Sequence, residues 1–140
     1  MGAVALAAIT AEPLEIAAHA TAVEHSAAGA IVTFSGAVRN HDNGNSVTEL
    51  EYHAHPSAGK VIAEVAAEFA ARDGVIAVAV SHRIGLLKIG ELAIVAAVSS
   101  AHRQLAFEVC AALIDEVKKL LPVWKRQVFN DGSDEWVNSA

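Results

Sequence analysis

The chain has 140 residues, of which 10 are Lys or Arg and 16 are Asp or Glu, so its formal net charge is −6 at pH 7. An acidic chain without a broad basic stripe does not fit a nucleic-acid-binding protein, because phosphate contacts need clustered positive charge. Hydrophobic residues make up 54% of the sequence, and so apolar and short a chain is expected to bury surface in an oligomer. The length predicts one domain that spans residues 1–140.

Three features bear on where the protein works. No Lys or Arg precedes Arg39, so neither a secretory signal nor an arginine-rich transit peptide is expected. The apolar run from Leu92 to Val98 is far too short to span a bilayer. The single cysteine, Cys110, excludes an internal disulfide and is expected to be a buried, unreactive thiol. The sequence therefore favours a reducing cytoplasm.

Hydrophobic periodicity and turn residues predict strands that interleave with helices. The predicted strands cover residues 4–10, 30–38, 47–53, 75–81, 92–99 and 123–129. The predicted helices cover residues 12–25, 56–72 and 101–121, with Pro56 in a first turn and Ser99-Ser100 as a cap. Residues 41–45 predict a turn or mobile loop, residues 84–90 a connection, and the end of the chain a polar tail. This order predicts an α/β or α+β sandwich without internal repeats.

The segment from Lys118 to Arg126 contains four of the ten basic residues around Pro122, which must end a helix. At about 100° per residue, Lys118 lies at the border of the apolar helix face, where partial burial would lower its pKa. A lysine before Pro122 and Lys125 after it can point into one pocket, which suits an anionic substrate or a carbonyl to be polarised. Equally, these residues can offset the helix dipole with their amines in water.

Other candidates are weaker. His102 and Arg103 lie in the first turn of the last helix, where free backbone N–H groups favour a phosphate or carboxylate, although such a pair is often surface decoration. Arg39 ends a strand beside a glycine-bearing loop. His53 and His55 point the same way on a strand, but no further ligand follows at zinc spacing, so no metal site is expected.

Several short motifs occur in a defined order along residues 30–137. They are Phe34-x-Gly36-x-Val38-Arg39-Asn40, Glu51-Tyr52, His82-Arg83-Ile84-Gly85, Gly90-Glu91, Ala101-His102-Arg103, Lys118, Pro122-x-Trp124-Lys125 and Trp136. No single motif is very specific, but in this order they resemble the large, catalytic subunit of molybdopterin synthase. The resemblance implies an α+β fold with an α/β hammerhead portion and a mixed or antiparallel sheet packed by helices.

The resemblance also implies a sulfurtransferase of molybdenum cofactor biosynthesis in the cytoplasm. In this family, cyclic pyranopterin monophosphate receives sulfur and becomes molybdopterin. The sulfur arrives as a thiocarboxylate on the C-terminal Gly-Gly tail of a small ubiquitin-like subunit. The implied assembly is a heterotetramer, a central homodimer with one small subunit at each end, and its active sites draw on both central protomers. Neither a metal nor a cofactor is implied at the transfer step.

Family membership would assign roles to nine residues. Lys118 and Lys125 would be the catalytic pair, which activates the thiocarboxylate carbonyl and manages protons or developing negative charge. The implied substrate-binding residues are Ala37, Val38, Arg39, His102, Arg103, Arg126 and Gln127. Three of these residues would hold the substrate phosphate and pterin: Arg39, His102 and Arg103. Ala37 and Val38 would offer backbone contacts. Many relatives carry an acidic residue at the position of Gln127, so this chain departs from the family there.

An alternative function is a non-catalytic oligomeric module that binds an anionic metabolite or the C-terminal tail of a partner. Such a module would keep binding at the basic pocket but would form no product with any thiocarboxylated partner. A third possibility is a degenerate paralogue that still dimerises and competes for the small subunit. The presence of both Lys118 and Lys125 argues against this third possibility.

Overall fold

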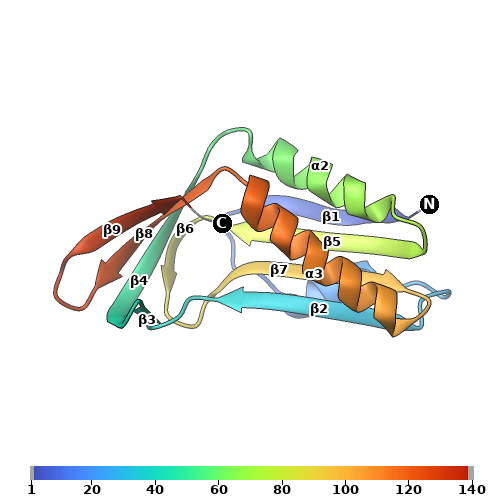
Figure 1. The fold of residues 1–140 in the computed structure, drawn as a ribbon, viewed down its shortest axis with the longest axis horizontal. Coiled ribbons are helices and arrows are strands. Elements are labelled where there is room, and N and C mark those ends of the chain that lie inside the picture. The colour runs from blue at the N-terminus through green and yellow to red at the C-terminus, as the bar shows by residue number, and fades with distance from the viewer. Residues whose placement is uncertain (1, 139–140) are drawn as a thin grey trace.

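The computed structural model describes residues 2–138, which form two sheets and three helices (Figure 1). The first sheet contains β1 (Ala3–Thr10), β5 (Val75–Arg83), β7 (Leu92–Ser100) and β2 (Ala30–Ala37), in that order. β1 runs parallel to β5, whereas β5 and β2 both run antiparallel to β7. The first sheet is therefore mixed, with β1 and β2 at its edges.

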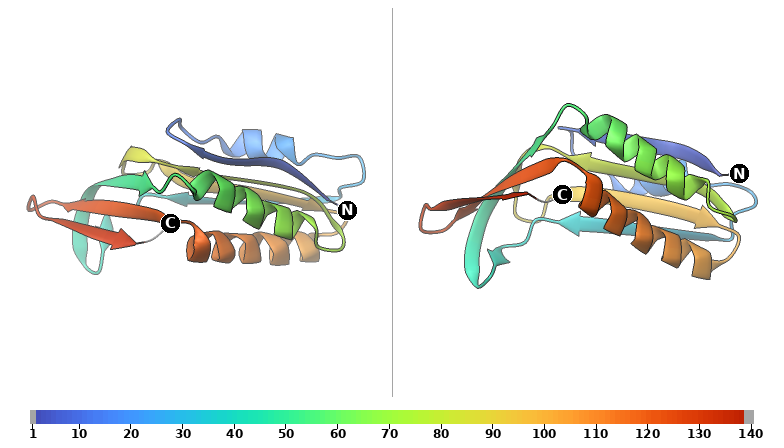
Figure 2. Two further views of the ribbon diagram at one scale, coloured as in Figure 1. Left: turned by 90° about the horizontal axis from the view of Figure 1, so that it is seen from above. Right: turned by 45° about the horizontal axis from the view of Figure 1, so that its top comes forward.

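Helices cover both faces of this sheet. α1 (Ile16–Ala22) packs on one face, and α2 (Ala58–Ala70) and α3 (Arg103–Leu120) lie side by side on the other (Figure 2). Because both faces are covered, β5 and β7 are buried almost throughout, which explains their continuous apolar runs. No helix within residues 2–138 combines the length and the apolar content needed to cross a bilayer.

The main core lies between the first sheet and the two helices on its second face. Ile62 and Phe69 of α2 and Leu113 of α3 are buried there with Val78 and Val98 of the sheet. Ile62 and Phe69 are two helical turns apart, so they share the face of α2 that meets the sheet. Burying a side chain of this size contributes about 1.5–3 kcal/mol to stability.

A second sheet projects from one end of the first (Figure 1). It contains β3 (His41–Asp42), β4 (Asn45–Ala54), β8 (Val123–Phe129) and β9 (Asp134–Asn138), in that order, and β6 (Gly85–Lys88) pairs with β4. The β3–β4 hairpin turns at Asn43 and Gly44, which both have positive φ, as a two-residue hairpin turn requires. The turn predicted within residues 41–45 is therefore confirmed.

The fold class predicted from the sequence is confirmed: it is α+β, with helices packed on a mixed sheet and a second, antiparallel sheet beside it. Two helices begin later than predicted. The chain bends after β1, where the backbone N–H of Glu12 donates to Thr10 Oγ1 at 3.0 Å, and α1 starts only at Ile16. Pro56 lies in a turn ahead of α2, which starts at Ala58. Both helices also end slightly earlier than predicted.

The start of α3 and two strands also differ from the prediction. Ser99 and Ser100 belong to β7 and do not cap the helix, which starts at Arg103 after the extended residue His102. The Ser100 hydroxyl donates instead to the carbonyl of His102 at 2.6 Å. β6 lies in the predicted connection and β9 in the predicted polar tail. Both strands depend on pairing with distant partners, β4 and β8, so local sequence carries little sign of them.

Candidate functional site

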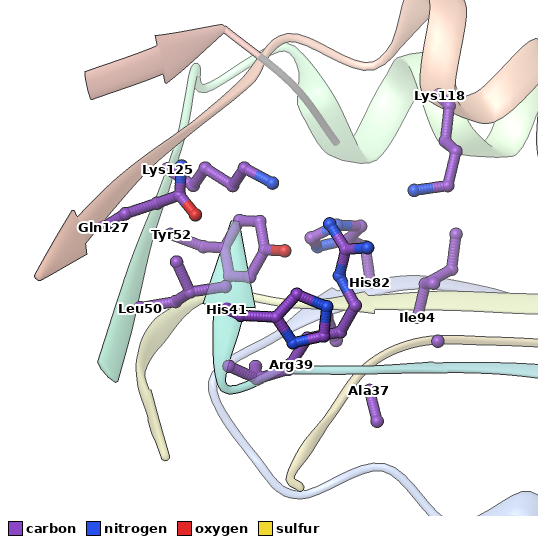
Figure 3. A pocket seen from close by; sticks show the side chains of 13 residues that line it. Ala37, Arg39, His41, Leu50, Tyr52, His82, Ile94, Lys118, Lys125 and Gln127 are labelled. Atoms are coloured by element: carbon purple, nitrogen blue, oxygen red, sulfur yellow. The ribbon is translucent and has the colours of Figure 1, made fainter. Parts of the chain in front are cut away.

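A cavity of about 220 Å³ lies where the two sheets and the end of α3 meet (Figure 3). Six predicted site residues line it: Ala37, Val38, Arg39, Lys118, Lys125 and Gln127. His41, Leu50, Tyr52, His82 and Ile94 complete most of the wall. Among the residues that the structure describes, none of those lining the cavity is acidic. The cavity therefore suits an anionic ligand.

Lys118 and Lys125 reach this cavity from different elements. Lys118 stands on the last turn of α3, and Pro122 separates it from β8, which carries Lys125. Figure 3 shows the two side chains extending into the same space from opposite sides. Lys118 keeps solvent exposure along its side chain, yet burial around its amine and the charge of Lys125 lower its pKa. The predicted convergence of two lysines on one pocket is confirmed.

Gln127 connects the cavity wall to the β3–β4 hairpin. Its side chain is buried, and its amide donates a hydrogen bond to Asp42 Oδ2 at 2.8 Å. The second oxygen of Asp42 lies 3.7 Å from a guanidinium nitrogen of Arg39, whose side chain is 66% exposed. An amide at position 127 can donate to Asp42, whereas a carboxylate there would face it with a like charge.

Arg126 lies outside the cavity, so the expectation that it shares the pocket with Gln127 is wrong. Side chains alternate between the two faces of a strand, and Lys125 and Gln127 take the face of β8 that meets the cavity. Arg126 takes the other face, where its Nε donates to Asp134 Oδ2 at 2.6 Å. That ion pair raises the pKa of the Arg126 guanidinium.

Val38 contributes a side chain to the wall, but its backbone is already paired. Its N–H donates to the carbonyl of Glu91 at 3.0 Å, and its carbonyl accepts from the N–H of Gly90 at 2.9 Å. Both backbone groups of Val38 are therefore already hydrogen-bonded within the chain, and the expected backbone contact to a substrate stays a prediction. Val38 is buried and gives the cavity an apolar surface.

His102 and Arg103 lie at the opposite end of α3 from Lys118. Arg103 and Lys118 are separated by 15 residues of helix, which corresponds to about 22 Å at 1.5 Å per residue. Neither His102 nor Arg103 lines the cavity. A single copy of the chain therefore does not bring them to the two lysines.

His82 and Tyr52 are two of the wall residues that were not predicted as site residues. His82 is fully buried, its ring packs against Tyr52 with centroids 4.9 Å apart, and its Nδ1 lies 2.8 Å from the carbonyl of Arg83. Burial and, to a smaller extent, the nearby charge of Lys118 lower the pKa of His82 to about 4. Burial also raises the pKa of Tyr52. In the sequence, His82 is a lone histidine at the end of an apolar strand. Such a histidine is as consistent with a turn or an interface as with a binding site.

In the described part of the chain, histidine and cysteine side chains form no cluster with acidic residues that fits a metal. Within residues 2–138, no group of three or more His, Cys, Asp or Glu side chains is placed to hold a metal ion. His53 instead contacts Glu51, with Nε2 3.0 Å from the carboxylate, and its ring packs against Trp136. Cys110 is buried as predicted, and burial raises the pKa of its thiol to about 11.

A second cavity, of about 400 Å³, is an apolar groove between the edge strand β2 and α3. Val32, Phe34, Phe107, Cys110 and Ile114 contribute to its lining. Phe107 is 59% exposed and Phe34 is 37% exposed, which is unusual for aromatic side chains that face one another across a groove. Along α3 the groove lies between Arg103 and Lys118.

Comparisons with known proteins agree with this architecture. The family model described as MoaE protein matches residues 9–120. A molybdopterin synthase catalytic subunit from Bacillus subtilis is 42% identical over 116 residues, which are 82% of this chain and 73% of that protein. A crystal structure of molybdopterin synthase from Staphylococcus aureus superposes with a TM-score of 0.86 at 32% identity, covering 95% of this chain and 96% of that one. A complex of subunits 1 and 2 of molybdopterin-converting factor from Helicobacter pylori shares the fold, with a TM-score of 0.70 at 20% identity over 96% of this chain and 89% of that one.

Proposed function

The chain belongs to the MoaE family of molybdopterin synthase catalytic subunits, and we propose that the cavity of Lys118 and Lys125 is its active site. There it transfers sulfur to cyclic pyranopterin monophosphate, from the C-terminal thiocarboxylate of a small ubiquitin-like subunit. The observation that carries this proposal is the entry of two lysine side chains into one cavity whose described lining has no acidic residue.

The lysines match the charge changes of this reaction. A thiocarboxylate that gives up its sulfur takes an oxygen from water and becomes a carboxylate. When water attacks the acyl carbon, negative charge develops on the acyl oxygen. A lysine beside that group stabilises the charge. The lowered pKa of Lys118 increases the share of neutral amine, which can take a proton from the attacking water. Lys125 approaches from the opposite wall, where it can polarise the acyl oxygen.

Arg39 is the residue of this cavity that suits the substrate phosphate. Its guanidinium stands at the cavity edge and is largely exposed, so an arriving anion can reach it. Asp42 restrains it from one side, and Gln127 in turn holds Asp42. The apolar wall at Ala37 and Val38 provides a surface for the pterin rings.

A second copy of the chain is needed to complete the site as the family resemblance describes it. His102 and Arg103 are too far along α3 to reach their own cavity. A two-fold axis through the apolar groove between β2 and α3 would place each copy's Arg103 beside the other copy's Lys118. The exposed aromatic side chains of the groove give such a dimer an apolar contact surface.

The small subunit completes the proposed assembly. The related complex from Helicobacter pylori contains subunits 1 and 2 of molybdopterin-converting factor. By analogy, one small subunit would bind each copy of this chain and thread its C-terminal tail into the cavity, which gives a heterotetramer. The cytoplasm, where such a pathway operates, is the proposed compartment.

A three-component reconstitution tests this function. The purified chain is mixed with a thiocarboxylated ubiquitin-like partner and cyclic pyranopterin monophosphate, and the dithiolene product is oxidised to its fluorescent derivative. Product that depends on all three components supports the synthase. A partner that binds but yields no product would instead favour the non-catalytic binding module.

A further inference from the structure

His82 presents a buried polar atom without a partner at the wall of the cavity. The residue is fully buried, and its Nε2 has no hydrogen-bond partner among the described residues. Most buried polar atoms in proteins are paired, because an unpaired one forfeits its hydrogen bond to water. The environment of Nε2 therefore needs an explanation beyond packing.

The other ring nitrogen fixes what Nε2 can do. Nδ1 lies 2.8 Å from the carbonyl of Arg83, and a carbonyl can only accept, so Nδ1 carries the proton. The ring of Tyr52, edge-on at 79°, holds the imidazole in this orientation. In the neutral imidazole, Nε2 is then a lone-pair acceptor on a side chain that lines the cavity.

Lys118 is the cation best placed to use this acceptor. It lines the same cavity, and its charge is close enough to His82 to act on that residue's protonation. Lysine has a flexible stem and a rotatable ammonium with three donors, so a change in side-chain torsions can bring its Nζ to Nε2. We propose that His82 is a positioning residue for Lys118: its Nε2 accepts a hydrogen bond from the Lys118 ammonium and holds it at the buried side of the cavity.

The other side chains of the cavity wall determine which groups can interact with Lys118 and His82. The other charged or titratable side chains that line the cavity are Arg39, His41, Tyr52 and Lys125. None of these is a carboxylate. A neutral acceptor fixes the position of the ammonium and adds no charge to the cavity. The catalytic meaning of this contact rests on the proposed function, but the contact itself does not.

Competitive labelling with acetic anhydride across a pH series, read by mass spectrometry, gives the apparent pKa of Lys118 in the chain alone. Loss of a hydrogen bond to the charged form lowers a lysine pKa. In His82→Leu we expect the pKa of Lys118 to fall by about one unit, so that labelling at a fixed pH below the pKa becomes about tenfold faster. His82→Gln, whose amide oxygen can accept, should restore most of the wild-type value. Lys60, exposed on α2, serves as the internal control.

Three results would overturn the proposal: an unchanged Lys118 titration in a folded His82→Leu variant, no recovery in His82→Gln, or an equal shift in Tyr52→Phe. If His82→Leu does not fold, nitrogen-15 spectra of the His82 ring decide, since Lys118→Met leaves His82 intact. The Nε2 resonance should then differ between wild type and Lys118→Met, and an identical resonance would contradict the contact. Neither experiment needs partner or substrate, so failure here is distinct from failure of sulfur transfer.

Discussion

The side-chain amide of Gln127 donates a hydrogen bond to the carboxylate of Asp42 at 2.8 Å, which ties β8 to the short strand β3. Gln127 is buried, so removing its acceptor leaves a buried N–H group without a partner. We expect Asp42→Ala to lower the free energy of unfolding by about 1–3 kcal/mol. Urea denaturation monitored by tryptophan fluorescence measures this difference.

Asp42→Asn is the matched control, because its amide oxygen can still accept from Gln127. This variant should recover most of the lost stability while it removes the negative charge beside Arg39. Equal stability of wild type and Asp42→Ala would show that the hydrogen bond contributes little to the fold.

His82 makes the fold sensitive to acid. The unfolded chain binds a proton at this residue below about pH 6.5, whereas the folded chain does so only near pH 4. Acidification through this window therefore favours unfolding, by about 3 kcal/mol in total. His82→Gln has no such proton to bind, so its stability should fall less than that of the wild type between pH 7.5 and pH 4.5. Urea midpoints at both pH values measure the loss of stability of each protein on acidification. An equal loss in the wild type and in His82→Gln would contradict the burial of a neutral imidazole.

The two-protomer site predicts complementation between inactive variants. In the proposed shared site, Lys118→Ala would inactivate the cavity of its own copy, and Arg103→Ala would inactivate the cavity of the other copy. A heterodimer of the two variants, purified through two different tags, then keeps one intact site. We expect it to show about half of wild-type turnover although both parent homodimers are inactive. A heterodimer as inactive as its parents would contradict a site that is shared between two copies.

Much of the fold could be predicted because burial dictates it. β5 and β7 are covered on both faces, so their apolar runs are continuous and unambiguous. β6 and β9 could not be found in the same way. Gly85–Lys88 and Asp134–Asn138 carry weak patterns, and they become strands through pairing with β4 and β8, which lie elsewhere in the sequence.

The site was predictable where one element determines a residue's position. The angular position of Lys118 on its helix and the break at Pro122 indicated a pocket shared with Lys125. The face of Arg126 was open to prediction as well, because strand alternation separates it from Lys125 and Gln127. The unpaired Nε2 of His82 depends on packing among three elements, which no local pattern encodes.

A single-turnover assay of the reconstituted enzyme tests whether Lys118 and Lys125 perform sulfur transfer. Wild type, Lys118→Ala, Lys125→Ala and the control Arg126→Ala are compared with saturating thiocarboxylated partner. Arg126 neighbours Lys125 but points away from the cavity, and its partly exposed ion pair with Asp134 is expected to contribute little to stability. Each lysine variant should lose at least about a hundredfold in rate, while Arg126→Ala keeps most of its activity. Folded lysine variants with the wild-type rate would contradict a catalytic role for Lys118 and Lys125.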